Sequence, residues 1–129
     1  MDLFVKDVVS VRGIYYLPEA GPGAAHEEAV ELLFEGGGSV VFTPATDWTL
    51  RVEGGRWPGL PDWCFPERDW ASIGLRAAEG HLPLGRCRRI VELTDEFGEV
   101  NGAELWFGRS RLSVRSGASL RVEVTALSS

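Results

Sequence analysis

Hydrophobic and polar residues alternate along much of this chain, and alternation with a period of two is typical of β-strands. The segments with this pattern are rich in β-branched and aromatic residues and are separated by glycine or proline. In chain order they are 8–16, 29–35, 39–43, 47–52, 87–94, 103–108, 111–115 and 120–125. We therefore predict a mainly β (or α+β) fold, an antiparallel sheet or open barrel of about six to eight strands with one or two short helices. The length of 129 residues predicts a single domain, residues 1–129.

The clearest local pattern is a hairpin around the three glycines at 36–38. With these glycines as the loop, one face carries facing apolar residues: Phe34 opposite Val40 and Leu32 opposite Phe42. Glu31 and Glu35 then lie on the opposite, outward face. The competing interpretation is a helix over 24–33, since Ala, Glu and Leu are good helix formers. The alternation and the glycine turn together favour the hairpin.

The middle of the chain, residues 56–86, interrupts the strand pattern. It contains several prolines and three of the five tryptophans: Pro58, Pro61, Pro66, Pro83, Trp57, Trp63 and Trp70. Each proline removes a backbone donor, so no long central strand is expected here. Asp69 is a candidate N-cap for a short helix over 70–79, which Gly80 would end.

The last four predicted strands form an antiparallel meander. Asn101-Gly102 predicts a tight turn between the first two of them. A three-residue loop between the last two sets Val114 opposite Leu120 and Arg111 opposite Glu123. From both halves we expect a core of inward-facing residues: Val30, Leu32, Phe34, Val40, Phe42, Leu50, Leu105, Phe107, Leu112, Val114, Leu120 and Val122.

The net charge of −6 changes this picture because it is unevenly distributed. Residues 13–50 contain no Lys or Arg, but hold these acids: Glu19, Glu27, Glu28, Glu31, Glu35 and Asp47. Nucleic acid is not expected as a partner, because duplex binding relies on Lys and Arg that neutralise phosphates. The acidic stretch favours a basic protein as partner. The simpler interpretation is a solvated face that keeps the protein in solution.

No catalytic or cofactor motif is complete. The only lysine is Lys6, which excludes a phosphate-binding loop, and 26–30 lacks the second histidine of a zinc peptidase. Cys87 with His81 is the one formal nucleophile–base pair. We therefore expect no cofactor, no metal ligands and no catalytic residues, and an enzyme is the least favoured class.

The location is predicted from the N-terminus and the cysteines. Residues 1–7 carry acids where a signal peptide has cations, and no apolar run approaches the roughly 20 residues of a membrane helix. We expect a cytoplasmic protein that does not associate with membranes. Cys64 and Cys87 are then expected to be reduced, with a bridge between them as the alternative for an exported protein.

Two stretches together resemble a known group of proteins. They are Val30-Glu31-Leu32-Leu33-Phe34-Glu35-Gly36-Gly37 through Asp47-Trp48-Thr49-Leu50, and Gly85-Arg86-Cys87-Arg88-Arg89-Ile90 through Phe97-Gly98 to Leu105-Trp106-Phe107. The pattern is similar to small bacterial domains, some of which lie beside polymorphic toxins and look like immunity proteins. The resemblance covers about residues 28–125 and implies an inhibitor that binds a protein. It consists of β patterning and turns, so it transfers no site residue.

Two functional hypotheses follow. The first is a binding protein that acts by protein–protein contact, an immunity-like inhibitor, through the acidic residues Glu27, Glu28, Glu31, Glu35 and Asp47. The second is a small-molecule-binding β-barrel whose pocket mouth is lined by Trp57, Trp63 and Trp70. Tryptophans in such a segment also act as interface anchors or as a cover over the core.

Overall fold

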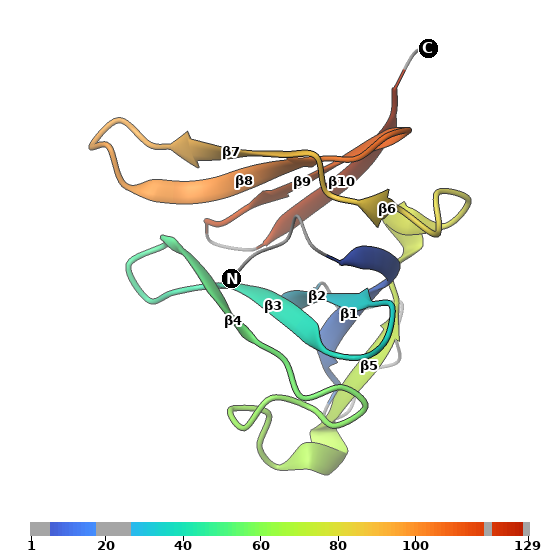
Figure 1. The fold of residues 1–129 in the computed structure, drawn as a ribbon. Coiled ribbons are helices and arrows are strands. Elements are labelled where there is room, and N and C mark those ends of the chain that lie inside the picture. Colours follow the sequence, from blue (N-terminus) through green and yellow to red (C-terminus); the bar gives the residue numbers. More distant parts are fainter. Residues whose placement is uncertain (1–5, 18–26, 118–119, 128–129) are drawn as a thin grey trace.

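The structure, a computed structural model, describes residues 6–17, 27–117 and 120–127. Two antiparallel sheets form its two layers (Figure 1). The six-stranded sheet has the order β4-β3-β2-β1-β5, with β6 also paired to β1, and the four-stranded sheet has the order β10-β9-β8-β7. The strands are β1 (Asp7–Tyr16), β2 (Ala29–Phe34), β3 (Ser39–Pro44), β4 (Leu50–Gly54), β5 (Trp70–Gly74), β6 (Gly85–Arg86), β7 (Arg89–Thr94), β8 (Val100–Trp106), β9 (Ser110–Arg115) and β10 (Arg121–Ala126).

The prediction of a mainly antiparallel β fold is confirmed. The strand count was too low, because two short strands, β5 and β6, form in the proline-rich middle; neither is a long central strand. The sheets do not close into a barrel. Helix in the described ranges is limited to two short 3-10 turns, η2 (Glu67–Asp69) and η3 (Arg76–Ala78).

One hydrophobic core lies between the two sheets. The six-stranded sheet contributes residues such as Val11, Leu32 and Val40, and the four-stranded sheet contributes Leu105 and Leu112. Every predicted core residue is buried except Leu50 and Val122, which are half-buried against the same cluster. Alternation along each strand therefore identified the inward face of both sheets.

The hairpin of β2 and β3 is confirmed with its turn one residue earlier than predicted. Phe34 N–H donates to the carbonyl of Gly38 (3.1 Å), which leaves 35–37 as the loop. Leu32 therefore faces Val40, with a register two residues away from the predicted one. A shift of two preserves the faces, so the apolar side chains still point the same way. The competing helix is wrong over its described part, which is strand from Ala29.

Three other local predictions are wrong. The turn between β7 and β8 lies at 95–99, where the Asp95 carboxylate accepts hydrogen bonds from the backbone N–H groups of Phe97 (2.8 Å) and Glu99 (3.0 Å). Gly102 lies within β8, where a Cβ would come 2.7 Å from the carbonyl oxygen of Val114. That glycine serves a close approach of strands and not a turn.

The predicted helix over 70–79 is replaced by β5 and η3. Residues of β5 pair with β1, where Trp70 faces Tyr16, and this long-range pairing overrides the local helix signals. In the last hairpin Val114 faces Val122 and Ser113 faces Glu123, again two residues from the predicted register. The expected pair of Arg111 with Glu123 is therefore not formed.

Candidate functional site

The outer face of the six-stranded sheet, turned away from the second sheet, is crossed by an irregular segment. Residues 55–69, here the covering segment, leave the end of β4 and return to the sheet at β5 (Figure 1). Beneath it, Ile14, Ala29 and Val41 of the sheet form a second apolar cluster with Cys64 of the segment itself. Leu60 of the segment and Trp70 pack against this cluster. The middle strands β2 and β3 are consequently buried on both faces.

Glu31 lies under the covering segment and is 1% exposed. Ser39 Oγ donates a hydrogen bond to its Oε2 (2.7 Å), and Arg12 faces it across β1 and β2. Gly55 N–H donates to the Ser39 carbonyl (2.9 Å), and a Cβ at position 55 would overlap both Ser39 Oγ and Glu31 Oε2. Burial raises the pKa of Glu31, while the Ser39 hydrogen bond and the charge of Arg12 lower it.

The prediction that Glu31 lies on an exposed, outward face is therefore wrong. Glu31 does point away from the inter-sheet core, because side chains alternate along β2 and its neighbour Leu32 points into that core. A distant part of the chain covers that face, and no partner can reach the carboxylate without displacing the segment. Glu31 is part of the folded structure and not an exposed contact.

Arg12 joins three elements on this face. Its Nε donates to Ser72 Oγ (3.1 Å) and its Nη2 to the Ser72 carbonyl (2.7 Å), which ties β1 to β5. The guanidinium lies 4.9 Å from the ring centroid of Trp57 in the covering segment. A cation placed over an indole face is attracted to it, so Arg12 holds Trp57 against the sheet.

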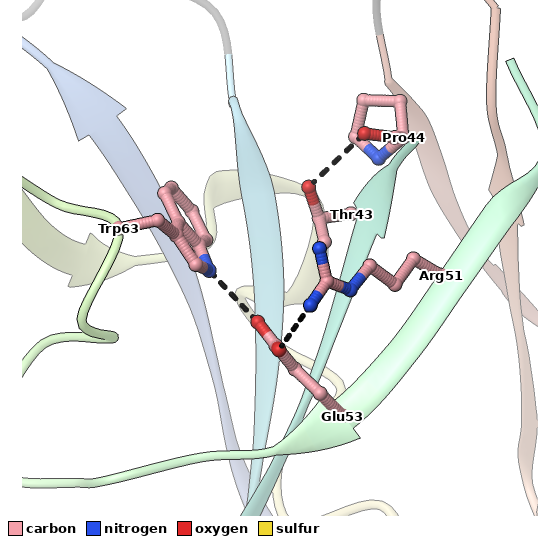
Figure 2. Close-up of polar contacts among 5 residues, drawn as sticks. All are labelled: Thr43, Pro44, Arg51, Glu53 and Trp63. Carbon is pink, nitrogen blue, oxygen red and sulfur yellow. Dashed lines mark hydrogen bonds and ion pairs between the residues drawn. The ribbon is translucent and has the colours of Figure 1, made fainter. Parts of the chain in front are cut away.

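Trp63 is held by polar and aromatic contacts. Figure 2 shows its Nε1–H donating to Glu53 Oε1 on β4 (2.7 Å), while Glu53 Oε2 pairs with Arg51 (3.4 Å). The same view shows the neighbouring Thr43 hydroxyl donating to the Pro44 carbonyl on β3 (3.5 Å).

The aromatic rings continue from this anchor to the far edge of the sheet. Trp63 meets Trp70 edge to face at 5.4 Å, and Trp70 in turn contacts Tyr16 at 5.0 Å. Trp57, Trp63 and Trp70 thus lie on one face of the six-stranded sheet. They lie on the outside of an open sheet, so the prediction that they line the mouth of a barrel is wrong.

Neither cysteine has the surroundings of a nucleophile. Burial, and then the carboxylates of Glu31, Glu53 and Glu67, raise the pKa of Cys64 to about 11. Burial also raises the pKa of Cys87, which belongs to the inter-sheet core. Both are free thiols, so the alternative of a bridge is not formed. Because the thiolate is the reactive form, both side chains serve packing.

Large aromatic side chains remain exposed on the covering segment. Phe65 is 83% exposed, Trp57 38% and Trp63 36%. Beside Phe65 the segment borders an open hollow of about 460 Å³. We call Trp57, Trp63 and Phe65 the aromatic surface. Phe65 and Arg12 were not singled out from the sequence, although an aromatic in a proline-rich segment and a lone cation in an apolar strand were usable signals.

The predicted acidic residues do not gather at one place. Glu28 precedes β2, Glu35 lies in the turn after it, and Asp47 lies in the next turn; all three are exposed. Seven residues of extended chain put the first two about 23 Å apart. Glu27 is half-buried and accepts a hydrogen bond from the Tyr15 hydroxyl (3.3 Å). Glu19 lies outside the described residues.

An apolar hollow of about 430 Å³ opens between the sheets at their β4 and β7 edges. Phe42, Leu50, Val52, Ile90 and Val100 line it together with Glu92, and no tryptophan is among the lining residues. Within the described ranges, no three His, Cys, Asp or Glu side chains are placed to hold a metal ion. The helical turns there are too short and too polar to cross a membrane.

Comparisons with known protein families, curated proteins and solved structures find no match for this chain. The resemblance to immunity-like domains therefore stays a hypothesis.

Proposed function

We propose that this protein acts by binding another protein, and that the aromatic surface of the covering segment is its contact surface. The partner is basic, and the mode of action is that of an immunity-like inhibitor that masks a functional face of its target. Glu28, Glu35 and Asp47 lie outside this contact surface and contribute negative charge around it.

The observation that carries this proposal is the 83% exposure of Phe65 on a short segment that also holds two partly exposed tryptophans. Several exposed aromatic side chains on one short segment are unusual on a surface that has no partner. Trp and Tyr are enriched among the residues that dominate binding energies at interfaces, and large aromatic rings serve as anchors there. The Phe65 ring is largely exposed to solvent, so its burial contributes little to the stability of the fold.

The rigidity of the neighbouring side chains supports the same use. Trp57 is held by Arg12, and Trp63 is held by Glu53 and Trp70. Side chains that are already ordered lose little conformational entropy when a partner binds, so more of the contact energy appears as affinity.

The charge of the protein supports a basic partner. The net charge is −6, and the exposed acids lie at both ends of the β2–β3 hairpin. A field of one sign increases the rate of encounter with a protein of the opposite sign and hinders like-charged proteins.

The test uses two phenylalanines of equal exposure. Phe65 is 83% exposed and Phe97, in the turn between β7 and β8, is 82% exposed. A photoreactive phenylalanine analogue at position 65 is expected to cross-link the partner in cells, whereas the same analogue at 97 is not. With the captured partner purified, Phe65→Ala should raise the Kd at least about tenfold and Phe97→Ala less than about twofold.

Salt and inhibition complete the test. The Kd should rise with ionic strength if the partner is basic, and the partner's activity should be inhibited by the native protein and much less by the Phe65→Ala variant. Equal losses of affinity from the two substitutions would place the contact elsewhere. No cross-link from position 65 would contradict the proposal directly.

A further inference from the structure

A hollow of about 600 Å³ lies at the seam between the two sheets, and none of its lining residues belongs to the covering segment. Its walls come from the loop before β6, from β6 and the residues after it, from the turn between β8 and β9, and from the end of β10. Figure 1 shows β6 and the loop that precedes it on the right of the view. The lining residues are Gly80, His81, Leu82, Pro83, Leu84, Gly85, Arg86, Arg88, Gly108, Arg109, Ser110 and Ala126.

The charged lining of this hollow is entirely basic. Arg86, Arg88 and Arg109 line it together with His81, and no Asp or Glu does. This is notable in a chain whose net charge is −6. Arg86 is paired with Asp7 (3.5 Å). Among the described residues, no carboxylate lies within ion-pair distance of either Arg88 or Arg109.

The backbone positions of Arg88 and Arg109 are fixed by hydrogen bonds to the four-stranded sheet. Arg88 N–H donates to the Trp106 carbonyl (2.7 Å), and the Arg109 carbonyl accepts from Leu127 N–H (2.9 Å). The Arg88 guanidinium lies along the turn between β8 and β9: a Cβ at Gly108 would come 3.5 Å from its Nε. The fold therefore brings Arg88 beside Gly108, which is twenty residues later in the sequence and directly precedes Arg109.

Cations that line one hollow repel one another, and an anion between them relieves that repulsion. Guanidinium groups bind phosphate and carboxylate through two parallel hydrogen bonds, which makes arginine well suited to such ligands. Leu82, Pro83, Leu84 and Ala126 supply an apolar wall beside the charged groups. The hollow thus combines donors for an oxyanion with space for an apolar stem.

We propose that this hollow, here the arginine hollow, binds a small organic oxyanion, a phosphate monoester or a carboxylate, carried on an apolar stem. Arg88 and Arg109 hold the oxyanion, and the apolar wall contacts the stem. This ligand site is separate from the aromatic surface, so its failure would leave the proposed protein contact untouched.

The experiment titrates the native protein with phenyl phosphate, benzoate, inorganic phosphate and phenol, followed by calorimetry and by NMR of the arginine Nε–H groups. Phenyl phosphate or benzoate is expected to saturate with a Kd on the order of 1 mM or tighter. Phenol, which has no anionic group, should not saturate. Tighter binding of phenyl phosphate than of benzoate assigns a phosphate, and the reverse assigns a carboxylate.

Charge-neutral variants locate the site. Arg88→Gln and Arg109→Gln are each expected to weaken binding about tenfold, the equivalent of 1.4 kcal/mol, while Arg121→Gln on β10 should change it less than about twofold. The urea midpoint of each variant verifies that it is folded. If one of the two arginine variants fails to fold, the other still tests the site. Equal weakening by Arg121→Gln, or no saturation with either organic anion, would overturn the proposal.

Discussion

At position 31 a carboxylate is buried between Ser39, Arg12 and the backbone of Gly55. Burial of an ionised group is costly unless it is paired and hydrogen-bonded. The Ser39 hydroxyl satisfies one oxygen of Glu31, and Arg12 on the next strand offsets part of its charge. The residual penalty appears as a raised pKa, so this residue links the stability of the outer face to pH.

The first prediction concerns Glu31→Gln, which keeps an acceptor for Ser39 and removes the charge. The pKa of Glu31 in the folded protein lies above its ordinary value of 4.5, so the native state binds the proton more tightly than the unfolded chain. Ionisation therefore destabilises the native protein as pH rises through the raised pKa. In urea titrations the variant should be more stable than the native protein at pH 7, with the difference vanishing below pH 4.5. A variant that is less stable by the same amount at every pH would contradict this.

The second prediction uses two adjacent glycines. A Cβ at Gly55 would overlap Ser39 Oγ and Glu31 Oε2, whereas a Cβ at Gly54 meets nothing within 4 Å. Gly55→Ala should lower the free energy of unfolding by about 1–3 kcal/mol, because the buried pair has to move. Gly54→Ala should change it by less than about 0.5 kcal/mol. Similar effects from both substitutions would show that the covering segment does not press on the Glu31–Ser39 pair.

The β2–β3 hairpin is the element on which both layers depend. All six residues of β2 are buried. One face of the hairpin packs into the inter-sheet core and the other lies under the covering segment. Strands buried on both faces are unusual in antiparallel sheets, where one face is commonly solvated. The hairpin therefore supports the candidate contact surface from below.

The third prediction concerns the hairpin core. Phe42 is buried among residues of both sheets, so Phe42→Ala leaves a cavity and should cost about 3–5 kcal/mol of unfolding free energy. Phe34→Ala, which is also buried, should cost a similar amount. Phe97→Ala, at an exposed turn, should cost less than about 0.5 kcal/mol. Urea unfolding followed by circular dichroism measures all three costs. A cost below about 1 kcal/mol for Phe42→Ala would show that Phe42 is not packed in the inter-sheet core.

At the scale of the whole molecule, the two sheets share one core and carry two separate candidate surfaces. The aromatic surface lies on the outside of the six-stranded sheet, and the arginine hollow lies where the sheets meet. Each surface is held by residues from several strands. Loss of packing between the sheets should therefore affect both surfaces together.

The fourth prediction tests this coupling. Leu105 lies on β8, in the sheet that carries none of the covering segment. Leu105→Ala should cost about 2–5 kcal/mol. Four of the five tryptophans lie at the six-stranded sheet or in the segments joined to it, and the fifth, Trp106, lies on β8. Tryptophan fluorescence should therefore report the same lowered urea midpoint as circular dichroism. A fluorescence midpoint that stays in place while the dichroism transition splits would show two independently folding units.

The residues of the candidate site illustrate how far sequence reasoning reached. The tryptophans were found because an irregular, aromatic-rich segment is visible in composition. The exposure of Glu31 was predicted wrongly, because alternation shows that Glu31 and Leu32 point to opposite faces but not what covers either face. The sequence did not indicate that Arg88 and Arg109 line one hollow, because two strands and a turn separate them along the chain.

The sequence by itself determined eight of the ten strands in the described residues, the inward-facing residues, and the β2–β3 turn to within one residue. Side-chain direction in a strand and the tolerance of glycine for positive φ are local properties. Only the tertiary structure decided which glycine positions closed each hairpin, that residues 70–74 pair with β1, and that 55–69 cover Glu31. These outcomes depend on which distant surfaces can be buried together. Burial energy is shared between segments far apart in the chain, and no local pattern contains it.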